Sequence, residues 1–141
     1  MAGQCCDCDP RTCAVALGRW TLGLLLLIVG LQKFPNVGGF ANFVMTQFEP
    51  TWLPRWLVAP YAYALPFLEV GLGILLLIGV YRNAVLFATG VLFLSLMFGQ
   101  ILLKSNVVAY NVMYVFMAAG VLYLGAHDRW VVGPQTGSRQ V

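Results

Sequence analysis

The residue best placed to do chemistry is Glu69, which lies near the middle of the apolar run Leu65–Gly79. This run belongs to a longer apolar stretch over 61–81, and its length and composition are typical of a membrane span. An acid at the centre of a span costs about 2.5–3.5 kcal/mol on insertion scales. A partner group or a water-filled path must offset that cost. The sequence therefore predicts a small membrane protein with one buried acidic site.

Other polar side chains are expected at a depth similar to that of Glu69. At 1.5 Å per residue, Glu69 and Tyr114 both lie about 12 Å from the outer ends of their spans. Tyr110, Asn111 and Tyr114 share one helix face by their spacing. We predict a polar pocket lined by Glu69, Gln100, Asn111, Tyr114, Tyr110 and Lys33. Such a pocket suits a polar head group, such as a quinone ring, or a small solute. It equally suits a structural network that holds the helices together.

Arg19 is a second charged residue within an apolar stretch, near the inner boundary of the first span. Snorkelling of its long side chain to the interface explains it without a functional role. Its estimated axial distance from Glu69 is about 9–10 Å, so a direct ion pair would require both side chains to stretch. Asp128 or another subunit is an alternative partner.

The cysteines form a cluster at the N-terminus, at positions 5, 6, 8 and 13. The spacing of Cys5, Cys6, Cys8 and Cys13 matches neither the paired CxxC of zinc ribbons nor the CxxC of dithiol redox enzymes. Candidate roles are a metal or iron–sulfur ligand set, a reactive thiol or acyl attachment. The alternative is a polar tip without a ligand. The single histidine, His127, ends a span, so the sequence excludes a haem held by two histidines of this chain.

The composition indicates which class of protein holds these residues in place. Hydrophobic residues make up 60% of the 141 residues and charged residues 9%, whereas soluble domains carry about 25% charged residues. Unbroken apolar stretches favour helices over the short alternating strands of a membrane barrel. The net charge of +3 is spread along the chain and predicts no nucleic-acid partner.

The predicted fold is an all-α membrane protein, a four-transmembrane-helix bundle with spans at about 14–34, 61–81, 84–103 and 107–126. Between the first two spans, Phe40, Phe43, Val44 and Phe48 recur at helical spacing. They predict an interfacial amphipathic segment within 36–60, the alternative being a plain loop. We divide the chain into a Cys-rich lead (1–13), a single membrane domain (14–130) and a polar tail (131–141). Slightly more basic residues on the side of the termini predict that both termini are inside.

Two glycine-rich patterns carry a resemblance to a known family. They are Arg19-x3-Gly23-x6-Gly30-x2-Lys33 in the first span and Pro66-x2-Glu69-x3-Gly73-x5-Gly79-x2-Arg82 in the second. Over about 14–126 the chain resembles the DoxX family of small four-helix membrane proteins. The resemblance implies a bacterial or archaeal plasma membrane, an inside N-terminus and association with redox machinery, such as thiosulfate:quinone oxidoreductases, terminal oxidases or oxidative-stress complexes.

Three functional hypotheses follow. The first is a membrane subunit of a quinone-linked or other redox complex, in which Glu69 is a polar anchor or proton site and a quinone is the candidate cofactor. It would have the lipid bilayer and other membrane or redox subunits as partners, and it need not be catalytic alone. The second is a structural or assembly subunit whose small residues pack closely, as in Ala84-x3-Ala88 and Ser95-x3-Gly99. The third is a small-solute or proton-coupled transporter. Small multidrug exporters of this size also carry a membrane glutamate, although theirs lies in the first span.

Overall fold

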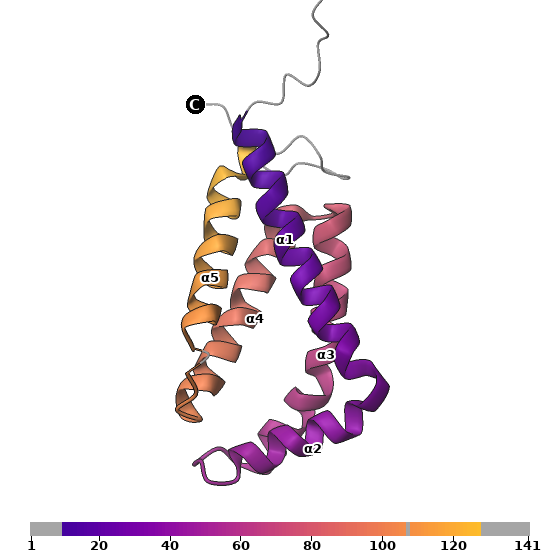
Figure 1. Cartoon of the computed structure of the whole chain (residues 1–141), viewed down its shortest axis with the longest axis vertical. Coiled ribbons are helices and arrows are strands. Elements are labelled where there is room, and N and C mark those ends of the chain that lie inside the picture. Colours follow the sequence, from indigo (N-terminus) through magenta and orange to yellow (C-terminus); the bar gives the residue numbers. More distant parts are fainter. Residues whose placement is uncertain (1–9, 107, 128–141) are drawn as a thin grey trace, which may run out of the picture.

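The protein is built from helices throughout the part that its computed structural model describes, residues 10–106 and 108–127 (Figure 1). The elements are α1 (Pro10–Lys33), the 3-10 helix η1 (Phe34–Asn36), α2 (Val37–Phe48), α3 (Arg55–Ile78), α4 (Arg82–Leu102), α5 (Val108–Tyr123) and the 3-10 helix η2 (Leu124–His127). The all-α prediction is confirmed for these residues.

Three helical stretches are long and apolar enough to cross a membrane: Pro10–Phe48, Arg55–Ile78 and Arg82–Leu102. The fourth apolar helix, α5, has 16 residues and is shorter. The observed helices lie close to the predicted spans, with one clear difference. α3 begins at Arg55, six residues before the predicted span, because Pro54 provides an extended residue just before the helix and Pro60 is accommodated within it.

Two turns determine how the helices are arranged. After α1, η1 contains Pro35, and Asn36 then caps α2 by accepting a hydrogen bond from Gly39 N at 2.8 Å. The chain thus changes direction within a few residues, and α2 runs across the end of the bundle (Figure 1). α3 ends at Gly79 with φ of 80°, the left-handed conformation that glycine favours at a helix C-terminus. A short turn then leads into α4.

Close backbone contact between α1 and α3 is the main packing feature. A Cβ added to Gly73 would lie 2.8 Å from the Leu27 backbone nitrogen and 2.9 Å from the Gly23 carbonyl oxygen. Small residues at a helix interface let two backbones approach in this way. α4 packs mainly on α5, and α2 packs on α3. The contacts between α3 and α4, and between α1 and α5, are less extensive.

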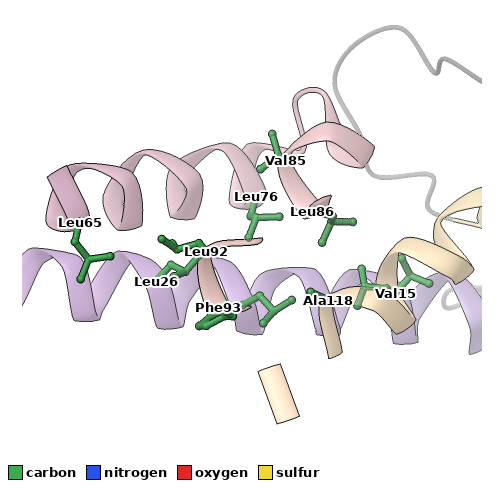
Figure 2. Packing of buried hydrophobic residues seen from close by; sticks show 11 residues of the cluster. Val15, Leu26, Leu65, Leu76, Val85, Leu86, Leu92, Phe93 and Ala118 are labelled. Atoms are coloured by element: carbon green, nitrogen blue, oxygen red, sulfur yellow. The ribbon is translucent and has the colours of Figure 1, made fainter. Parts of the chain in front are cut away.

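The apolar core lies where α1, α3, α4 and α5 meet. Figure 2 shows this cluster, which includes Leu26 of α1, Leu65 of α3, and Leu92 and Phe93 of α4. The outer surface is also apolar, with Phe87, Phe116 and many other large side chains exposed. Exposed apolar surface on this scale marks a membrane-embedded protein rather than a soluble one.

Candidate functional site

The predicted buried acid forms an ion pair with the last residue of α1. Lys33 Nζ lies 2.6 Å from Oε1 and 2.6 Å from Oε2 of Glu69, which is on α3. The Glu69 side chain is 2% exposed and that of Lys33 is 18% exposed. Nζ also lies 4.9 Å from the centroid of the Phe40 ring on α2, within the range of a cation–π contact. Three helices therefore meet at one ammonium group.

The backbone packing explains why this acid and this base meet. A Cβ added to Gly30 would lie 3.1 Å from Glu69 Cβ and 2.7 Å from Val70 Cγ2. Gly30 therefore lets α3 approach α1 at Glu69, one turn before Lys33. Lys33 ends α1, where a cation also interacts favourably with the negative end of the helix dipole. The resulting pair carries no net charge, which offsets the cost of an acid inside a membrane protein.

An aromatic pair lies beside the ion pair in sequence and joins η1 to α3. The rings of Phe34 and Phe67 have centroids 5.1 Å apart and planes at 72°, an edge-to-face arrangement. Such pairs contribute roughly 0.5–1.5 kcal/mol beyond the area they bury. This contact supports the geometry that brings Lys33 to Glu69.

The other residues of the predicted pocket do not form hydrogen bonds with this ion pair in the described part of the chain. Tyr114 packs against Phe93, with ring centroids 5.2 Å apart, and belongs to the edge of the apolar core. Gln100 and Asn111 are half-buried, and Tyr110 is exposed. The structure thus brings together Lys33 and Glu69, while a lining role for the remaining four residues stays a prediction.

A polar contact between α3 and α4 was missed at the sequence level. The Tyr61 hydroxyl lies 2.7 Å from Ser95 Oγ, which in turn donates to the Leu92 carbonyl oxygen at 2.7 Å. Because Ser95 uses its proton there, Tyr61 is the donor to Ser95. The sequence feature that could have indicated this contact is the hydroxyl of Ser95 in Ser95-x3-Gly99, but Ser95 was considered there only as a small packing residue.

Arg19 differs from its prediction. The residue is 1% exposed and lies on the side of α1 that faces the bundle, so its side chain does not snorkel along the outer surface. Snorkelling was inferred from its position near a span end, but the buried positions of α1, which include Val15, Leu22 and Leu26, recur with it at helical spacing. The ion-pair partner of Glu69 is Lys33.

The remaining positions of the two glycine-rich patterns have structural roles. Gly23, Gly30 and Gly73 form the α1–α3 contact, and Gly79 ends α3. Pro66 is buried within α3, one turn before Glu69. Arg82 begins α4, and its guanidinium covers Gly125, where an added Cβ would lie 3.1 Å from Nη2.

The cysteine cluster lies mostly outside the described residues. Cys13 is on the first turns of α1 and is disulfide-bonded, whereas Cys5, Cys6 and Cys8 fall outside the described ranges. Within 10–106 and 108–127, no three His, Cys, Asp or Glu side chains are grouped to hold a metal ion. A metal or iron–sulfur site at the N-terminal cysteines stays a prediction.

Comparison with known proteins gives one match. A family model described as methylamine utilisation protein MauE matches residues 11–109, more than half of the chain. No curated protein and no solved structure matches. The resemblance to the DoxX family was wrong, because the family model that matches is MauE. The glycine-rich patterns on which it depended describe the close α1–α3 contact, and such a contact is not specific to one family. The chain is a multi-pass membrane protein that belongs to the MauE family.

Proposed function

We propose that this chain is an accessory membrane protein for methylamine utilisation, which works with the redox proteins of that process. The match to the MauE family model over residues 11–109 carries the proposal. The geometry supports an accessory role, because the Lys33 ammonium contacts both oxygens of the Glu69 carboxylate. In this arrangement Glu69 connects α1 to α3 and is not available as a general base. A quinone ring anchored on Glu69 would have to displace Lys33.

In the membrane, we propose four spans, formed by α1, α3, α4 and α5. The 16 residues of α5 and the 4 residues of η2 together extend about 30 Å, which matches the hydrocarbon core of a bilayer. We place α2 along the membrane surface. Its outer side carries Asn42, Thr46 and Gln47, and Trp52 and Trp56 just after it are each 75% exposed. Tryptophan favours the interface between lipid and water.

For the orientation, we propose a plasma membrane protein with the N-terminal end of α1 inside. By the order of the four spans along the sequence, Arg11, Arg82, Arg129 and Arg139 fall on that side. Lys33, Arg55 and Lys104 fall on the opposite side, so basic residues are slightly more frequent on the side proposed to be inside.

Cysteine labelling tests the orientation. Gln47→Cys and Asn83→Cys, in a chain whose native cysteines are serines, are exposed to a membrane-impermeant maleimide on whole cells. We expect labelling at position 47 alone. Labelling at position 83 alone would overturn the proposed orientation.

Gene disruption in the source organism tests the function. The disrupted strain is expected to stop growing on methylamine and to grow normally on a carbon source supplied with ammonium. The wild-type gene and Glu49→Gln, a change in the exposed Glu49–Arg55 pair, should restore growth. Glu69→Gln should restore it poorly. Growth of the disrupted strain on methylamine at the wild-type rate would contradict the proposal.

A further inference from the structure

We propose that the Glu69 carboxylate and the Phe40 ring form a binding site for a small primary alkylammonium ion, and that the Lys33 side chain occupies this site as a tethered ligand. The inference rests on the proposed function and deepens it, because it gives the chain a direct interaction with the class of amine in the family description. The site is formed by α1, α2 and α3 at the end of the bundle where α2 lies (Figure 1).

The contacts of Lys33 show what the site recognises. The side chain ends in a –CH2–NH3+ group. Methylammonium, CH3–NH3+, is the same group with a hydrogen in place of the rest of the side chain. That ammonium lies 2.6 Å from each Glu69 oxygen and 4.9 Å from the Phe40 ring centroid. A carboxylate accepts charge-assisted hydrogen bonds from an ammonium, and an aromatic face attracts the cation. A free alkylammonium can make the same contacts.

The acid and the base differ in how firmly the structure holds them. Glu69 lies in the interior of α3, is 2% exposed and has its Cβ against Gly30. Lys33 is the last residue of α1, precedes the η1 turn, and keeps part of its side chain exposed. A lysine at such a position can extend its ammonium to the interface. Glu69 therefore stays in place while its cation can be exchanged.

Exchange of Lys33 requires a replacement cation. If Lys33 moved away alone, an uncompensated acid would stay buried, which is strongly unfavourable. Entry of a small alkylammonium removes that cost and restores the hydrogen bonds to both carboxylate oxygens. Tetramethylammonium cannot do so because it has no N–H donor, and sodium offers no N–H donor either.

Competition with the tether sets the expected affinity. A group on a short flexible linker has an effective concentration on the order of millimolar or more. The wild-type chain should therefore respond to methylammonium only at high concentration. Removal of the Lys33 side chain should lower the methylammonium concentration that is required for a response by roughly tenfold or more.

The test is thermal unfolding of the purified full chain in detergent. Methylammonium chloride is compared with sodium chloride and tetramethylammonium chloride at equal ionic strength. We expect methylammonium alone to raise the Tm of the wild type, and to raise that of Lys33→Ala at concentrations roughly tenfold lower. Lys33→Ala combined with Glu69→Gln should lose the response. Arg55→Ala, which breaks the surface pair with Glu49, should respond as the wild type does.

Two results would overturn the site. One is a wild-type Tm that methylammonium raises no more than sodium does, a measurement that needs no variant to fold. The other is an equal methylammonium response in the variant that lacks both Lys33 and Glu69. The proposed function has a separate readout. If growth on methylamine requires the gene and no binding occurs, only the site fails, whereas binding without a growth requirement refutes the proposed function alone.

Discussion

Removal of the Glu69 charge is the sharpest test of how the helices are held together. In Glu69→Gln the Lys33 ammonium loses the carboxylate that contacts it at 2.6 Å. Loss of one partner of a buried ion pair costs about 3–5 kcal/mol. Because Lys33 is 18% exposed and can extend toward the interface, we expect the lower end of that range, about 3 kcal/mol in the free energy of unfolding.

The measurement is unfolding of the purified chain by SDS in mixed micelles, followed by loss of helical circular dichroism. The matched control is Glu49→Gln. Glu49 pairs with Arg55 at 2.8 Å, but their side chains are 51% and 69% exposed. Exposed pairs contribute about 0–1 kcal/mol, so the control should unfold nearly as the wild type does.

A double variant distinguishes the contribution of the ion pair to stability from the cost of leaving one buried charge without a partner. Lys33→Met with Glu69→Leu removes both charges, and apolar replacement of a whole buried pair is often neutral. We therefore expect the double variant to be more stable than Glu69→Gln. If Glu69→Gln costs no more than Glu49→Gln, the pair does not stabilise the α1–α3 contact and the reasoning fails.

Further variants test three other features by the same SDS titration. Gly30→Ala should lower the free energy of unfolding by about 1–3 kcal/mol, because the added Cβ would lie 2.7 Å from a neighbouring side chain. The control Gly90→Ala, where an added Cβ has nothing within 4 Å, should raise it by up to about 1 kcal/mol. Equal effects of the two substitutions would argue against close packing at Gly30. Tyr61→Phe should cost roughly 0.6 kcal/mol and should have no further effect in a chain with Ser95→Ala, so additive losses would contradict the 2.7 Å hydrogen bond. Tyr81→Gly should gain about 1 kcal/mol because Tyr81 has φ of 45°, and a loss of stability would show that the tyrosine ring outweighs the backbone strain.

The positions of the long helices could be predicted from the sequence because they depend on local information. Apolar runs and Pro35 are enough to locate both ends of α1 and α4, and the end of α3, within a few residues. The start of α3 was missed because Pro60 is usually taken as a helix boundary. The burial of Glu69 was predicted correctly, because an acid that faces lipid within such a run is strongly unfavourable.

The sequence placed Lys33 in the same pocket as Glu69 but did not decide between Lys33 and Arg19 as its ion-pair partner, because that choice depends on helix register. Estimated depths placed Lys33 at the membrane boundary and Glu69 well below it. In the structure α3 is longer than predicted and passes the end of α1, so Glu69 lies level with Gly30. A one-turn difference of this kind is about 5 Å, enough to turn a distant pair into a contact. The family was misassigned because the glycine-rich patterns reflect close helix packing, which does not identify a family.

The η1 turn has a consequence for communication across the membrane surface. Only Phe34, Pro35 and Asn36 separate Lys33 from α2, and Phe40 of α2 contacts the Lys33 ammonium. A protein that bound the outer side of α2 and tilted that helix would thereby alter the surroundings of a charge inside the bundle. Conversely, a change in the cation at Glu69 would alter the angle at which α2 meets that protein.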